Sequence, residues 1–119
     1  MNAHSNLGVL LQKKGDLAGA EAAYRKAIKI DPHYAMAHLN LGVLLHTKTG
    51  DLDGAQAEYR TVIEIDPRHM GAHNNLVILL KKRGDWAGAE KVYLSILEID
   101  PAHANAKKFL PVVRENMRK

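Results

Sequence analysis

The chain repeats one tripeptide three times, as Ile30-Asp31-Pro32, Ile65-Asp66-Pro67 and Ile99-Asp100-Pro101, at intervals of 35 and then 34 residues. A recurrence with a period of roughly 20 to 50 residues indicates a repeat architecture. In such a fold each copy is one supersecondary unit that buries its apolar face against its neighbours. The period therefore predicts an array of like units before any single residue is interpreted.

Each copy contains two stretches of apolar residues at helical spacing, and neither shows the alternation of a strand. A Gly-Asp pair separates the two stretches in every copy, as Gly15-Asp16, Gly50-Asp51 and Gly84-Asp85. Glycine ends a helix at low cost in the left-handed conformation, and the following aspartate can cap the next helix. The Asp-Pro pair then ends the second helix, because the residue before proline is driven out of the α region. The sequence predicts an all-α chain.

The resemblance is to the tetratricopeptide repeat, whose marks are Leu-Gly in the first helix, alanine and an aromatic residue in the second, and a closing proline. The matching residues are Leu7, Gly8, Ala20, Tyr24, Ala27 and Pro32; Leu41, Gly42, Ala55, Tyr59 and Pro67; and Leu76, Ala89, Tyr93 and Pro101. The resemblance implies a right-handed helical-repeat array with three helix pairs, at residues 1–34, 35–69 and 70–103. Residues 104–119 are expected to form a closing helix.

Three local departures lead to further expectations. The second copy has one extra residue within His46–Gly50, which predicts a longer turn between its two helices. Val77 replaces the family glycine and should widen the local packing without changing the topology. Pro111 lies inside the closing helix and is expected to kink it or to end its first part near Leu110. The first helix has no preceding cover, so it is exposed, or the chain is cut from a longer array, or copies associate end to end.

Composition favours a soluble, cytoplasmic domain, because no apolar run approaches the roughly 18 residues of a membrane span and no targeting segment is recognised. The chain has no cysteine, which removes disulfides and thiolate chemistry. Residues 1–100 hold twelve basic and twelve acidic residues, so the net charge of +4 lies after Pro101. Nucleic-acid binding is therefore unlikely, and only a weak interaction through the basic closing helix stays as an alternative.

In this family the concave face is lined mainly by first helices, and the resemblance implies that it binds an extended peptide without catalysis. The most regular polar element there is one asparagine in each copy, at Asn6, Asn40 and Asn75. This row resembles the asparagine ladder in the repeat domain of O-linked N-acetylglucosamine transferase, where it holds peptide main chain. An asparagine amide both donates and accepts hydrogen bonds, which suits backbone recognition. In the alternative, each asparagine bonds only its own helix or water.

The other residues that the resemblance places on this face are Asn2, Ser5, Val9, Gln12, Lys13, Met36, Leu39, Val43, His46, Thr47, Gly71, Asn74, Ile78, Lys81 and Lys82. The apolar members are expected to contact ligand side chains, and Lys81 and Lys82 to favour an acidic residue at one end. The carboxylate clamp, with which some family members hold chaperone C-terminal tails, is matched here only at Asn40. Binding of such a tail is therefore disfavoured.

No catalytic residue, metal site or cofactor site is predicted. His4, His38 and His73 recur at one position on successive first helices, which do not readily bring ligands within about 2 Å of one ion. They are expected to pack in a partly buried position, whereas His33, His69 and His103 beside the Asp-Pro turns are expected to be solvated. The carboxylates of Glu58, Glu64, Glu90 and Glu98 are assigned to helix surfaces. A protein or peptide partner is expected, and a self-assembling or excised array segment is the alternative.

Overall fold

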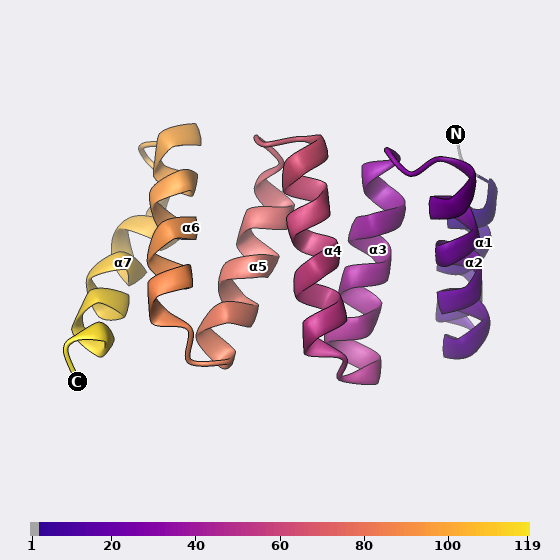
Figure 1. Cartoon of the computed structure of the whole chain (residues 1–119), viewed down its shortest axis with the longest axis horizontal. Coiled ribbons are helices and arrows are strands. Elements are labelled where there is room, and N and C mark those ends of the chain that lie inside the picture. Colours follow the sequence, from indigo (N-terminus) through magenta and orange to yellow (C-terminus); the bar gives the residue numbers. More distant parts are fainter. Residues whose placement is uncertain (1–2) are drawn as a thin grey trace. The chain divides into compact units, whose positions relative to one another are not determined.

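The computed structural model describes residues 3–119, and helices make up most of this part of the chain (Figure 1). The elements in chain order are α1 (Ala3–Lys13), α2 (Leu17–Ile30), α3 (Ala35–Leu44), the π-helical turn η1 (Leu45–Thr49), α4 (Leu52–Ile65), α5 (Met70–Lys82), α6 (Trp86–Ile99) and α7 (Ala104–Met117). No strand occurs among these residues. The chain is an all-α helical-repeat array, as the sequence predicted. Asn2 lies outside the described residues.

The Gly-Asp pairs end and begin helices in the predicted way. The glycines have positive φ angles of 85° at Gly15, 75° at Gly50 and 76° at Gly84. Each following aspartate accepts a hydrogen bond from the backbone N–H three residues later, at 2.9 to 3.0 Å. A cap of this kind stabilises a helix by about 1 kcal/mol. The same aspartate cap therefore sets the starts of α2, α4 and α6.

The Asp-Pro pairs end the second helices, and two histidines then begin the next helices. Asp31 leaves the helical region, with φ −137° and ψ 90°, and the equivalent aspartates do the same. His69 and His103 are half-buried N-caps, whose Nδ1 atoms accept from the backbone N–H groups of Ala72 at 3.0 Å and Ala106 at 3.1 Å. The expectation that these two histidines are solvated was wrong. Each ring accepts a hydrogen bond from an N–H group in the first turn of the helix, which has no carbonyl partner within the helix. His33 is exposed as expected.

The helices group into two units, residues 1–67 and residues 68–119, which we call the N-terminal and C-terminal units. In the N-terminal unit α2 packs against α1 and α3, and α4 packs against α3. Its core includes Tyr24, Leu41, Leu44, Tyr59 and Val62. In the C-terminal unit α6 packs against both α5 and α7. Leu76, Leu79, Leu80, Ile96 and Val113 are buried there.

Close contact between first and second helices requires glycine in the first two copies. A methyl group on Gly8 would lie 2.5 Å from a ring carbon of Tyr24, and one on Gly42 would lie 2.8 Å from a ring carbon of Tyr59. Both tyrosines are 1% exposed, so their rings have little room to move. The glycine of the Leu-Gly mark is therefore the residue of the first helix against which the tyrosine ring of the second helix packs. In the third copy Val77 is itself buried, and α5 and α6 still pack as a pair.

The extra residue of the second copy widens the end of the first helix instead of lengthening the turn. Residues Leu45–Thr49 form a π-helical turn that continues directly from α3. The hydroxyl of Thr47 donates to the Val43 carbonyl oxygen at 2.7 Å, and that of Thr49 to the Leu45 carbonyl oxygen at 3.2 Å. These bonds satisfy carbonyl groups at the helix end. The prediction of a longer turn is corrected accordingly.

Pro111 does not end the closing helix, because α7 runs through it from Ala104 to Met117. Leu110 and Val113 on either side of the proline are 7% and 1% exposed, and α7 packs against α6. Their burial holds the helix together despite the missing N–H donor of proline. Of the two predicted effects of Pro111, an end of the helix near Leu110 was wrong, and a kink stays a prediction.

The first helix has an apolar face without cover. Leu7 and Leu10 of α1 are 45% and 49% exposed, whereas the corresponding Leu41 and Leu44 of α3 are 1% and 0% exposed. The difference follows from packing, because α2 lies against α3.

Within residues 3–119 we find no helix with the length and hydropathy needed to cross a membrane.

Candidate functional site

The first helices α1, α3 and α5 each carry one of the predicted asparagines, and these three side chains differ in exposure. Asn6 on α1 is exposed, whereas Asn40 on α3 and Asn75 on α5 are half-buried. The side-chain N–H of Asn40 donates to the hydroxyl of Ser5 at 3.3 Å. An amide group has two N–H donors and a carbonyl oxygen, so this bond leaves the oxygen and one donor of Asn40 for another partner.

Ser5 has a different role from the one expected of a groove residue. It is 2% exposed, because it lies where α1 and α3 contact each other. A side chain buried to this degree does not touch a ligand without rearrangement. Ser5 instead orients the amide of Asn40, so its predicted contact with a peptide is corrected to a supporting position.

A pocket of about 420 Å³ opens between α1 and α3 in the N-terminal unit. We call it the N-terminal pocket, and its lining residues are Val9, Gln12, Lys13, Tyr24, Leu39, Asn40, Val43 and Lys48. Six of the residues expected on this face therefore meet in one cavity, namely Val9, Gln12, Lys13, Leu39, Asn40 and Val43. The predicted Met36 is 45% exposed and lies outside this lining, as does Asn6. Sequence reasoning missed the contribution of Lys48.

A second pocket, of about 340 Å³, lies between α5 and α7 in the C-terminal unit. Its lining residues are Asn74, Val77, Ile78, Lys81, Tyr93, His103, Asn105 and Phe109. The predicted Asn74, Ile78 and Lys81 meet here, whereas Asn75 and the exposed Lys82 do not line it. Phe109 and Asn105 come from α7, which sequence reasoning treated only as a cover for the array.

Each buried tyrosine hydroxyl bonds a side chain near the end of its own first helix. Tyr24 Oη donates to Gln12 Oε1 at 3.0 Å, Tyr59 Oη lies 3.2 Å from His46 Nδ1, and Lys81 Nζ donates to Tyr93 Oη at 3.0 Å. The Lys81 ammonium also lies 4.2 Å from the ring centre of Phe109. The sequence contains a signal for this set, because all three partners occupy one position of the repeat.

The hydroxyls of Tyr24 and Tyr59 stay neutral over the physiological pH range. Burial raises the pKa of the Tyr59 hydroxyl to about 12, and it also raises the pKa of Tyr24. The cause is desolvation, which disfavours the phenolate. A neutral Tyr24 can donate to Gln12, so these two polar groups in the lining of the N-terminal pocket are hydrogen-bonded to each other before any ligand arrives.

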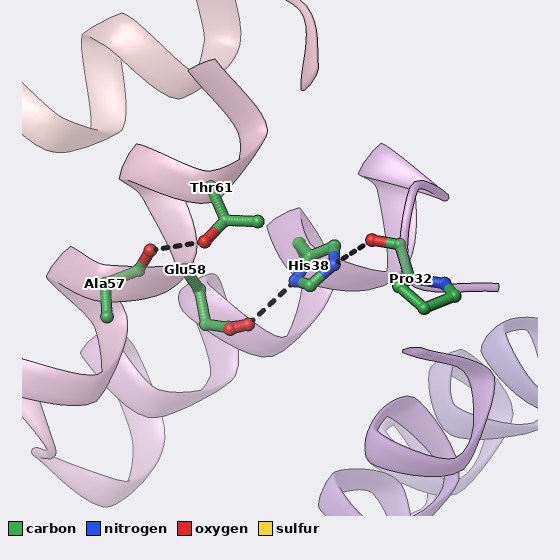
Figure 2. A network of polar contacts seen from close by, with 5 residues as sticks. All are labelled: Pro32, His38, Ala57, Glu58 and Thr61. Carbon is green, nitrogen blue, oxygen red and sulfur yellow. Dashed lines mark hydrogen bonds and ion pairs between the residues drawn. The ribbon is translucent and has the colours of Figure 1, made fainter. Parts of the chain in front are cut away.

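His38 fixes α3, the helix that carries Asn40, through both ring nitrogens (Figure 2). Its Nε2 lies 2.7 Å from the carbonyl oxygen of Pro32, and its Nδ1 lies 2.9 Å from Oε1 of Glu58 on α4. Because a carbonyl oxygen only accepts, Nε2 is the donor to Pro32. The predicted packing role is confirmed for His38 and His73, which are 7% and 4% exposed.

The assignment of Glu58 to a helix surface was wrong, because its side chain is 16% exposed and faces His38. Glu90 is also only partly exposed, at 26%, and bonds Arg114 on α7 at 2.9 Å. Glu64 and Glu98 are exposed as expected. In residues 3–119 no three of the histidine and carboxylate side chains are grouped as metal ligands would be.

Three models of the tetratricopeptide repeat match the chain, at residues 2–34, 23–57 and 46–110. No curated protein is significantly similar to it in sequence. Among solved structures, the first TPR of Spaghetti (RPAP3), bound to the HSP90 peptide SRMEEVD, is similar with a TM-score of 0.78. The two chains are 16% identical, and the match covers 98% of this chain and 94% of that one. This likeness supports the fold.

Proposed function

The chain belongs to the tetratricopeptide repeat family, and from this premise we propose that it is a non-catalytic scaffold that binds an extended peptide along its first helices. Asn6, Asn40 and Asn75 hydrogen-bond the ligand main chain. Met36, Leu39, Val43 and Ile78 supply apolar contacts.

The observation that carries this proposal is the setting of Asn40. Its amide is held by the buried hydroxyl of Ser5, and it lies in the wall of an open pocket among Val9, Leu39 and Val43. Ligand sites of this type combine apolar walls with a few placed polar groups. An amide with one donor and its oxygen unused, in such a wall, matches the paired N–H and C=O groups of an extended main chain.

The similar solved domain holds a short peptide, SRMEEVD of HSP90, and this supports a peptide as the class of ligand here. The chaperone tail itself is not proposed as the ligand of this chain. The carboxylate clamp uses lysine, asparagine and arginine, and its positions other than that of Asn40 are occupied here by Ser5, Val9, Gly71 and Asn75. Ser5 is also buried. A clamp without its cations loses the charge-assisted hydrogen bonds that hold a terminal carboxylate.

The proposal is tested by replacing Asn6, Asn40 and Asn75 together with alanine and capturing partners from a cell extract. We expect the captured proteins to be lost, because the backbone of the ligand loses its hydrogen-bond partners on the first helices. The matched control is Asn116→Ala, since the Asn116 amide bonds the Val112 carbonyl oxygen on α7 and lies outside both pockets. A triple variant with a wild-type circular dichroism spectrum that retains every partner would overturn the proposal.

We propose two alternatives of other kinds. The exposed Leu7 and Leu10 on α1 suit a segment of a longer array or end-to-end association. The basic residues of the closing helix suit weak nucleic-acid binding. We propose a cytoplasmic location, because a chain without cysteine fits a reducing compartment.

A further inference from the structure

The charges of the repeats are separated by helix type, although the first 100 residues are neutral in sum. Helices α1, α3 and α5 and the turn η1 contain no aspartate or glutamate. Their only side chains of fixed charge are Lys13, Lys48, Lys81 and Lys82. The acidic residues before Pro101 all lie in second helices and in the turns. A ligand on the first helices therefore meets cations without neighbouring carboxylates from those helices.

The π-helical turn brings one of these cations to the N-terminal pocket. In the first copy Val9 and Lys13 both line the pocket, and they are four residues apart on an α-helix. In the second copy Val43 and Lys48 both line it, and they are five residues apart. Backbone hydrogen bonds in a π-helical turn join residues five apart, and such turns within α-helices occur frequently at functional sites. The extra residue thus gives Lys48 the place beside Val43 that Lys13 has beside Val9.

The resulting pocket has two chemical parts. Val9, Leu39 and Val43 form an apolar wall, and Lys13 and Lys48 are exposed side chains on its lining. Its volume of about 420 Å³ lies within the usual range for ligand pockets. The polar groups of Gln12 and Tyr24 in its lining bond each other. A large aliphatic side chain can therefore enter without leaving either of those groups unpaired.

We propose that the N-terminal pocket selects a large aliphatic side chain with a carboxylate on each side of it in the peptide, and that Lys13 and Lys48 bind those carboxylates. This specificity rests on the proposed function, because it names the peptide that the same face binds. The two lysines complement an acidic peptide in charge. The apolar wall is complementary to an aliphatic side chain, so acidic residues alone do not fill the pocket. Neither lysine is a position of the carboxylate clamp.

The test is an NMR titration of the whole chain with three capped heptapeptides. The first is Ser-Glu-Gly-Leu-Gly-Glu-Ser, in which the leucine and both glutamates share one face of an extended chain. The second replaces both glutamates by glutamine, and the third replaces leucine by glycine. We expect the first peptide to shift the backbone amides of Val9, Asn40 and Val43 in a saturable way. An exposed ion pair contributes up to about fivefold in affinity, so the glutamine peptide should bind several-fold more weakly, and added salt should reduce the difference. The glycine peptide should bind more weakly still.

Single substitutions of the chain test the role of each lysine's charge. Lys13→Gln and Lys48→Gln should each weaken binding of the glutamate peptide by about two- to fivefold. The affinity for the glutamine peptide should not change. Lys14→Gln is the matched control, because Lys14 is exposed and does not line the pocket. Circular dichroism and urea unfolding verify that each variant is folded.

Two deletions of identical composition test the register. Deleting Thr47 places the lysine four residues after Val43 and should keep the preference for glutamate. Deleting Thr49 leaves Lys48 five residues after Val43 but removes the extra residue, and an α-helical end then turns the lysine away from the pocket. This second deletion should lose the part of the preference that depends on Lys48.

Equal affinities for the glutamate and glutamine peptides at the same amides would overturn the specificity and leave peptide binding intact. Equal effects of Lys14→Gln and Lys48→Gln would also overturn it. Absence of saturable shifts on α1 and α3 with all three peptides would contradict both the specificity and binding of peptides in this pocket.

Discussion

Replacing Tyr59 by alanine is expected to lower the free energy of unfolding by about 3 to 5 kcal/mol, the cost typical of removing a buried aromatic side chain. The ring is 1% exposed and lies against Gly42, where even one added methyl group would come within 2.8 Å of it. Close packing around the ring limits how far the surroundings can collapse into the cavity. The loss is a large part of the 5 to 15 kcal/mol or so by which domains are usually stable.

Urea unfolding followed by circular dichroism measures this effect, with Tyr59→Phe as the control. Phenylalanine keeps the ring and removes the hydroxyl, which lies 3.2 Å from His46 Nδ1, so a loss of about 1 kcal/mol is expected. Similar losses for the two variants would contradict the packing role of the ring. Tyr34→Ala, at a half-buried position without a side-chain cap bond, should have the smaller effect of a partly exposed residue.

Replacing His38 by alanine is expected to cost about 2 to 3 kcal/mol. Its ring bridges the Pro32 carbonyl oxygen and the Glu58 carboxyl group at 2.7 and 2.9 Å, so the change leaves two part-buried polar groups, one of them the Pro32 acceptor, without this partner (Figure 2). An acceptor left without a partner in a buried place costs about 1 to 3 kcal/mol. Asn40 lies two residues further along α3, so the loss also loosens the helix that carries the candidate site.

A double-mutant cycle separates the pair from the packing of the ring. Urea unfolding of His38→Ala, Glu58→Ala and the double variant should give losses that do not add, with an interaction energy of about 1 to 2 kcal/mol. Strict additivity would show that the two side chains do not stabilise each other. Glu64→Ala is the matched control, because this glutamate is exposed on the same helix.

The helices could be predicted from the sequence because the residues that end and begin them recur in each copy. Gly15-Asp16 and its two equivalents perform one task in every copy, and three occurrences in register distinguish a rule from coincidence. The asparagine row was found in the same way. Features that occur in a single copy gave no such signal, and the structure changed several of them.

Glu58 is an instance, because Ala23 and Val92 occupy the corresponding positions of the other copies, and no periodic pattern marks it as a partner of His38. The extra residue of the second copy is another. A loop and a widened helix end can each absorb one residue, and the bonds of Thr47 and Thr49 that favour the widened end appear only in three dimensions. The burial of Ser5 likewise depends on how closely α1 approaches α3.

Recognition of a peptide main chain by Asn40 is tested most directly by a double-mutant cycle on binding. One change is Asn40→Ala, and the other replaces one backbone amide of a captured peptide by an ester, which removes a single N–H donor. Calorimetry gives the four affinities, and the ester is placed at each amide in turn. At one amide we expect an interaction energy of about 0.5 to 1.5 kcal/mol, the usual contribution of one hydrogen bond. Additive losses at every amide of the peptide would contradict backbone recognition by this asparagine.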